Sequence, residues 1–187
     1  RYPARSSFYI PRAILSNFEP GINVLDPFMG SGTTAVEASL VGANIYGTEL
    51  DPFARLIAEV SLYRLNEFDV VSLNEIFREI HSTFLNRQPN DELIPNLYNI
   101  RYWFNEQVFE QLLQLKTAIF EDITNEKYKN FFKIVYADCI KPSSKMERQS
   151  TKPYISSKYE KKIKPVTESF EYSFNRILKA LLQYDST

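Results

Sequence analysis

Gly30 and Gly32 are the residues whose positions most clearly predict a binding role. They follow the apolar residues 22–25 and Asp26, which together predict the end of a strand. Glycine adopts backbone angles that other residues avoid, and it places no Cβ between a loop and a ligand. Thr33 suits a helix start, where unpaired N–H groups point toward whatever lies above the loop. This stretch therefore predicts a strand, a glycine loop and a helix that approach a ligand closely.

A second strand is predicted over residues 44–49, and it ends on an acid. Glu49 lies 23 positions after Asp26, close to the spacing of about 20 residues at which a Rossmann-type unit places a carboxylate on ribose hydroxyls. Asp51 and Pro52 then suit the start of another helix, because aspartate caps the first turn and proline fits its first position. The pattern predicts two strands whose carboxyl ends carry a glycine loop and a carboxylate.

The string Asp-Pro-Phe-Met-Gly-Ser-Gly-Thr-Thr at residues 26–34, followed by Gly-Thr-Glu-Leu-Asp-Pro-Phe-Ala at residues 47–54, resembles the cofactor-binding motifs of amino-group DNA methyltransferases. These enzymes transfer a methyl group from S-adenosylmethionine to the exocyclic amine of adenine or cytosine. The close resemblance covers residues 24–58, and a weaker one covers residues 2–15. A nucleotide-binding loop of another kind is the competing interpretation, but dinucleotide loops have three spaced glycines and no Asp-Pro-Phe lead-in.

The resemblance implies a role for each residue of the loop. Asp26 would hold the methionine amino group, Phe28 would line the pocket, and Glu49 would accept hydrogen bonds from the ribose hydroxyls. Leu50 and Asp51 would flank the adenine. The alternative is that Asp51 serves only as a helix cap. The expected cofactor-binding residues are Ser6, Asp26, Pro27, Phe28, Gly30, Ser31, Gly32, Thr33, Glu49, Leu50 and Asp51.

The N-terminal residues 2–6, Tyr-Pro-Ala-Arg-Ser, lie where the family folds a segment over the methionine end of the cofactor. By this resemblance Ser6 and Ser7 would hydrogen-bond the cofactor carboxylate. The alternative is an N-terminal helix that only packs on the sheet, and a short helix is predicted over residues 11–15. Phe53 would stack on the adenine or be buried, and the sequence leaves both open.

The length and composition of the chain limit the classes of protein to which it can belong. The chain has 187 residues, 44% of them apolar, which suits one domain or one domain with an appendage. Its formal net charge is −1, so contact with DNA requires a local basic patch. Cys139 and His81 are the single cysteine and histidine, so neither a disulfide within the chain nor a metal site is expected. No signal peptide or bilayer-spanning apolar run is present, and a cytoplasmic location is expected.

From residue 66 onward, long amphipathic patterns replace the strand signals. We expect an α/β fold: a partial Rossmann-like methyltransferase sheet with a large helical insertion or appendage. The expected parts are a cofactor-binding α/β part at 1–65, a helical block at 66–140, and a basic segment with a closing helix at 141–187. The block suits a lid, a DNA-facing subdomain, a dimer surface or a brace. Helical spacing occurs over 53–65, 70–84, 103–119, 131–135 and 168–181, and residues 88–99 predict a loop.

Residues 141–165 hold eight basic and two acidic residues, with serines and tyrosines between them. Cations contact phosphates, hydroxyls donate hydrogen bonds to them, and aromatic rings stack on bases. DNA is therefore the expected partner of this segment, and a solvated, mobile linker is the alternative. The expected nucleic-acid-binding residues are Lys145, Arg148, Lys152, Lys158, Lys161 and Lys162.

The sequence lacks one part that amino methylation needs. The family uses a loop of Asp, Asn or Ser followed by Pro-Pro and Tyr or Phe, which holds the amine of a flipped base. No Pro-Pro pair occurs in the chain, and the stretch from Thr151 to Tyr154 lacks the second proline. No catalytic residue is therefore assigned, and a missing catalytic half or a second subunit is an expected partner. A start at Arg1 rather than Met is also expected of a fragment.

The expected function is the S-adenosylmethionine-binding portion of a site-specific DNA methyltransferase of restriction–modification type, inactive by itself. Two alternatives stay open. One is a fragment of an RNA guanosine amino-group methyltransferase, because those enzymes share the Asp-Pro-Phe and Gly-x-Gly features. The other is a non-catalytic subunit that binds DNA or a partner through the helical block and the lysine-rich segment.

Overall fold

A computed structural model of the protein describes residues 7–147, 150, 152–158 and 160–184. The chain forms two compact units. Unit 1 comprises residues 1–64 and 181–187, and unit 2 comprises residues 65–180. The first boundary was expected one residue later, after 65. The expected helical block and most of the basic segment and closing helix share unit 2.

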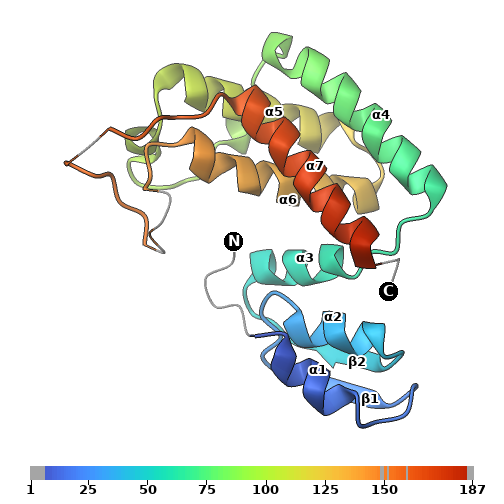
Figure 1. The fold of residues 1–187 in the computed structure, drawn as a ribbon. Helices are drawn as coiled ribbons and strands as arrows, with labels where there is room; N and C mark the ends of the chain where they lie inside the picture. The colour runs from blue at the N-terminus through green and yellow to red at the C-terminus, as the bar shows by residue number, and fades with distance from the viewer. Residues whose placement is uncertain (1–6, 148–149, 151, 159, 185–187) are drawn as a thin grey trace. The chain divides into compact units, whose positions relative to one another are not determined.

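Two short parallel strands form the centre of unit 1. They are β1 (Asn23–Asp26) and β2 (Asn44–Gly47), and their register pairs Leu25 with Tyr46. The helix α2 (Thr33–Leu40) connects the strands and packs on them. Helix α1 (Tyr9–Leu15) packs on α2, and α3 (Pro52–Ser61) follows β2 and also contacts α2 (Figure 1). The predicted order of strand, glycine loop, helix, strand and helix is confirmed, in a mixed helical fold with a two-stranded parallel sheet.

An ion pair fixes α1 on α2. The Nε and Nη2 groups of Arg12 donate to the two carboxylate oxygens of Glu37 at 2.7 and 3.1 Å. The Glu37 side chain is 4% exposed, whereas that of Arg12 is 52% exposed. A buried carboxylate needs such a partner, because its charge would otherwise lose hydration without compensation.

Side chains alternate between the two faces of the strands, as strand geometry requires. Val24, Asp26 and Ile45 are half-buried on one face. On the other face the cross-strand neighbours Leu25 and Tyr46 are 69% and 60% exposed. Parallel sheets in α/β proteins are usually covered on both faces, so this apolar pair is an unusual surface for such a sheet.

Unit 2 is helical in the described residues. Its main elements are α4 (Glu67–Thr83), α5 (Glu106–Asp122), α6 (Glu126–Ser143) and α7 (Val166–Tyr184), of which the last turn of α7 is grouped with unit 1. Short 3₁₀ helices connect α4 to α5: η1 (Phe84–Asn86), η2 (Asp91–Leu93) and η3 (Ile100–Trp103). The predicted helices are thus confirmed, and residues 88–99 form a connection that contains η2.

An aromatic cluster holds α4, α6 and α7 together. Phe77 of α4 stacks on Phe174 of α7 with ring centroids 4.2 Å apart, and Phe132 of α6 stacks on Phe174 at 5.8 Å. His81 lies against Phe77 and Phe170, at centroid distances of 5.2 and 6.3 Å. His81 therefore packs on this cluster.

Asp69 joins the start of α4 to α6. Asn66 and Asp69 form a capping box, in which each side chain accepts from the other residue's backbone N–H. Asp69 also accepts from Lys127 Nζ at 2.7 Å and from the Tyr128 hydroxyl at 3.0 Å. Burial alone would raise the pKa of the Asp69 carboxyl, but hydrogen bonds from Lys127, Asn66 and Tyr128 outweigh it and lower the pKa below its usual value.

Candidate functional site

The loop between β1 and α2 lies at the carboxyl ends of both strands. Its backbone is bound to the residue that follows β2: Thr48 N donates to Asp26 O at 3.1 Å, and Met29 N donates to Thr48 O at 3.0 Å. The Thr48 hydroxyl donates to Pro27 O at 2.6 Å. These bonds extend the pairing of the strands into the loop and hold it in one conformation.

Glu49 reaches this loop with its side chain. Its Oε2 accepts from Gly30 N at 2.7 Å, and its Oε1 accepts from Asp51 N at 2.9 Å. The structure therefore brings together the glycine loop and the carboxylate that the sequence predicted to be neighbours. A carboxylate offers about four acceptor positions, so two remain for hydroxyl groups of a ligand.

The two loop glycines have backbone angles that favour glycine, with φ of +53° at Gly30 and +82° at Gly32. At Gly32 the absent Cβ leaves room for the protein rather than for a ligand. A Cβ built there would lie 2.7 Å from the Cβ of Ala58 in α3. The sequence-based explanation of Gly32 as a gap for a ligand is therefore replaced by close packing of the loop on α3.

The start of α2 follows directly from this glycine. Gly32 is the N-cap residue, and it supplies no side chain to accept from the first N–H groups of the helix. Thr33 is the first helical residue, as predicted, and the residue is 9% exposed. Ser31 is half-buried beside it. The first turn of α2 thus presents backbone donors at the end of the loop.

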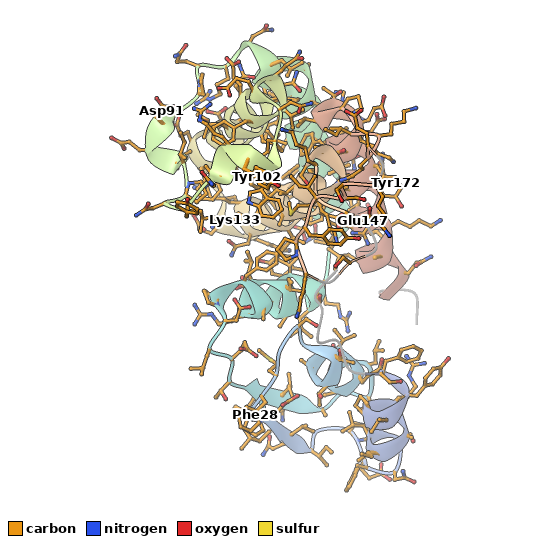
Figure 2. All side chains as sticks on the ribbon, turned by 90° about the vertical axis from the view of Figure 1, so that its left-hand side faces the viewer. Phe28, Asp91, Tyr102, Lys133, Glu147 and Tyr172 are labelled. Atoms are coloured by element: carbon orange, nitrogen blue, oxygen red, sulfur yellow. The ribbon has the colours of Figure 1, made fainter. Side chains whose placement is uncertain are left out.

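Apolar side chains beside the loop are exposed. Phe28 is 89% exposed and Leu50 is 100% exposed, and Phe53 in the first turn of α3 is 42% exposed. Figure 2 labels Phe28 among the side chains of unit 1. In the described part of the chain, Asp26 Oδ1 accepts from Phe28 N at 3.1 Å and the second carboxylate oxygen has no hydrogen-bond partner. Asp51 Oδ1 accepts from Phe53 N at 2.9 Å, so Asp51 does cap α3.

The remaining expected residues of this site are either exposed or outside the described range. Pro27 is exposed at the beginning of the loop, and Ser7 is exposed just before α1. Ser6 lies outside the described residues. In the described part of the chain, no three His, Cys, Asp or Glu side chains gather in a metal-binding arrangement.

The basic segment is fixed to the end of α6 by its own lysines. Lys161 Nζ donates to the carbonyl oxygens of Lys141 and Ser144 at 2.5 and 2.7 Å, and Lys141 Nζ donates to Ser150 O at 2.6 Å. A lysine at a helix carboxyl end satisfies unpaired carbonyls and the helix dipole. Lys161 therefore has a structural role that the sequence did not reveal.

The other predicted nucleic-acid-binding residues differ in exposure. Lys152, Lys158 and Lys162 are exposed, and Lys145 is half-buried. Arg148 lies outside the described residues. None of the described helices has the length and apolar character needed to cross a bilayer.

Residues 7–59 match a family model described as DNA methylase, of the N6 and N4 type. The match contains the glycine loop, Glu49 and most of α3. The resemblance of this chain to amino-group DNA methyltransferases is therefore confirmed.

Three curated relatives support the same class. The chain is 28% identical to the type II methyltransferase M.MvaI of Kocuria varians over 135 residues, 69% of this chain and 29% of that protein. It is 31% identical to the type II methyltransferase M.MjaII of Methanocaldococcus jannaschii over 126 residues, 64% of this chain and 23% of that protein. It is 30% identical to the type II methyltransferase M.MthZI of Methanothermobacter thermautotrophicus over 129 residues, 68% of this chain and 33% of that protein.

The chain thus spans between about a quarter and a third of the length of these relatives. No solved structure matches it.

Sequence reasoning missed three contacts that shape unit 1. They are the Arg12–Glu37 ion pair, the fit of Gly32 against Ala58, and the fit of Gly47 against Met29, whose thioether occupies the place of a Gly47 Cβ. Only Gly47 carried a signal, because glycine at the end of a strand often marks a close approach. The partners of all three lie far away in the chain.

Proposed function

We propose that this chain is the S-adenosylmethionine-binding portion of a site-specific DNA methyltransferase of restriction–modification type. The reaction of the whole protein is transfer of a methyl group to an exocyclic amine of adenine or cytosine. The observation that carries the proposal is the hydrogen bond from Gly30 N to Glu49, which joins the glycine loop to a carboxylate at the ends of two parallel strands. We further propose that this sheet is part of a Rossmann-like fold.

The residues beside the loop fit such a cofactor by their chemistry. Glu49 retains two acceptor positions for the paired hydroxyls of a ribose. Asp26 retains one carboxylate oxygen for a cationic amino group. Phe28 and Leu50 offer exposed apolar surface for an adenine ring. Pro27, Ser31 and Thr33 shape the loop and the first turn of α2 below the methionine portion.

The bound cofactor supplies an electrophilic methyl group on a sulfonium. The task of this chain is to bind and orient it, since Asp26 and Glu49 anchor the two polar ends of the molecule. Such positioning increases the rate of methyl transfer, because it aligns the methyl group for in-line transfer to the target amine. Within this sequence no residue is assigned to hold the target amine, because the Pro-Pro loop of the family does not occur.

We propose that another part of the protein, or a second subunit, supplies that loop. The open face of β1 and β2 supports this, because Leu25 and Tyr46 are directly opposed and largely exposed. Parallel sheets are usually covered on both faces, and further elements on this face would bury the pair.

Isothermal titration calorimetry with S-adenosylmethionine tests the cofactor site. We expect binding to this chain, and a loss of affinity of at least tenfold in Asp26→Ala and in Glu49→Ala, because each removes a charge-assisted contact. Glu19→Gln, an exposed acid in the turn before β1, is the matched control and should bind as the parent does. Equal binding by all four proteins, or none by any, would show that the loop is not the site.

A further inference from the structure

A cavity of about 390 Å³ lies in unit 2, between the start of α5 and the basic segment. It is separate from the glycine loop, and all of its lining residues lie between 105 and 163. Most of them are polar or charged, and two are isoleucines, Ile155 and Ile163. The volume falls within the usual range of small-ligand pockets, about 300–1,000 Å³.

Backbone hydrogen bonds hold the walls of the cavity in place. Lys145 N donates to Trp103 O at 2.8 Å, which ties the basic segment to η3. Glu147 N donates to Tyr154 O at 2.9 Å, which closes the segment on itself. Lys161 holds the segment on the end of α6. The cavity is therefore formed without a ligand, and a ligand that enters it orders little of the protein.

The lining groups suit a phosphate. Lys145, Lys158 and Lys161 bring three cations to the cavity, and Ser156 and Ser157 bring two hydroxyls. Asn105 also lines it and precedes α5, and its side chain caps none of the first N–H groups of that helix. Two acids, Glu147 and Glu160, line the cavity as well, so the cations outnumber the acids by only one. The cavity therefore suits one phosphate diester better than a highly charged anion.

Two exposed tyrosines lie close in the chain to residues that line the cavity. Tyr102 of η3 is 58% exposed and Tyr154 of the basic segment is 46% exposed. Tyr102 adjoins Trp103, the residue that binds Lys145, and Figure 2 labels Tyr102 and Glu147 in unit 2. Exposed tyrosines next to cations are typical of surfaces that contact nucleosides and phosphates together.

We propose that this cavity binds a backbone phosphate of DNA and that Tyr102 contacts the adjoining nucleoside. The choice of DNA as the source of the phosphate rests on the proposed function. The inference gives the helical block a role, because Asn105 before α5 lines the cavity and Trp103 of η3 binds the backbone of Lys145. It also divides the lysines: Lys145 and Lys158 contact DNA, whereas Lys161 builds the wall.

The test is the salt dependence of binding to a fluorescein-labelled DNA duplex, followed by anisotropy without S-adenosylmethionine. Each lost phosphate contact reduces the slope of log affinity against log salt by roughly 0.9. Lys145→Gln with Lys158→Gln removes the contact to the one bound phosphate, so it should flatten the slope by about 0.9 and weaken binding at least tenfold at low salt. Lys179→Gln, which removes an exposed lysine from α7, should leave both unchanged.

A second pair of variants tests the aromatic contact. Tyr102→Ala should weaken binding roughly fivefold or more with an unaltered salt slope, because stacking is not electrostatic. Tyr102→Phe should retain the affinity of the parent. Far-UV circular dichroism and Trp103 fluorescence show whether each variant is folded. If Tyr102→Ala is misfolded, the comparison of the double lysine variant with Lys179→Gln decides the test.

Three outcomes would overturn the proposal. In the first, the double lysine variant behaves as Lys179→Gln does. In the second, the variants lose affinity for an RNA duplex and keep it for DNA. In the third, inorganic phosphate at constant ionic strength displaces the DNA, which would make the cavity a site for small anions. Because these titrations contain no cofactor, they are independent of the calorimetric test of the glycine loop.

Discussion

The backbone N–H of Gly30 donates to the carboxylate of Glu49 at 2.7 Å, although the two residues are 19 positions apart. The same carboxylate accepts from Asp51 N at 2.9 Å. Glu49 therefore connects the loop after β1 to the start of α3. It orders the loop even without a ligand, so its role in the proposed site is both structural and direct.

We predict that Glu49→Ala loosens the loop as well as the binding of a cofactor. Loss of two hydrogen bonds to a charged acceptor should cost about 2–4 kcal/mol locally. Hydrogen-exchange mass spectrometry on peptides from residues 27–40 would show faster exchange. Glu49→Gln keeps one acceptor oxygen and should show a smaller increase. Unchanged exchange in both variants would mean that Glu49 does not order the loop.

Gly32→Ala should destabilise unit 1 for two reasons that a control can separate. The left-handed backbone costs a residue with a Cβ about 1–2 kcal/mol, and the overlap with Ala58 adds about 1–3 kcal/mol. Gly21→Ala has a similar φ of +87° and nothing within 4 Å of the new Cβ, so only the first cost applies. Hydrogen exchange in α2 and α3 measures the destabilisation of unit 1 in both variants. Tryptophan fluorescence would not report it, because the single tryptophan, Trp103, lies in unit 2. Equal effects would refute the packing explanation.

Asp69 should make the stability of unit 2 depend on pH in the acid range. Its pKa is lower in the folded protein than in the unfolded chain, where it is about 3.9. Its contribution is therefore complete above that value and is lost as the pH falls through the folded pKa. Urea unfolding followed by Trp103 fluorescence should show a decline below about pH 4.

Asp69→Asn should remove that part of the decline and lower the stability at neutral pH by about 2–3 kcal/mol, because it leaves Lys127 without its carboxylate. This loss of stability is at the low end for a buried ion pair, because the side chain of Lys127 is 35% exposed. An acid profile identical to that of the parent would exclude Asp69 as a source of the pH dependence.

Cys139 should resist thiol reagents until unit 2 unfolds. Its side chain is fully buried in α6, and burial raises the pKa of the thiol to about 12. Its Sγ donates to Val135 O at 3.0 Å. We expect no reaction with an aromatic disulfide reagent in native buffer and one equivalent of reaction in urea. Rapid labelling of the native chain would show that unit 2 opens locally around α6.

Local patterns in the sequence were enough to place most elements. Helical and strand spacing depend on neighbours within a few residues, so β1, α2, β2 and α3 could be predicted in order. The Asp51 cap and the first residue of α2 also follow from local rules. The proposed cofactor residues were chosen by resemblance, because a motif preserves chemistry that periodicity alone does not describe.

By itself, the sequence determined the class of elements, their order, and the glycine loop with its acid. Only the tertiary structure decided that Gly32 makes room for Ala58, that Lys161 closes the end of α6, and that η3 lies against the basic segment. The physical reason is distance along the chain. Residues tens of positions apart meet only when helices pack, and that packing depends on the shapes of all the side chains at once.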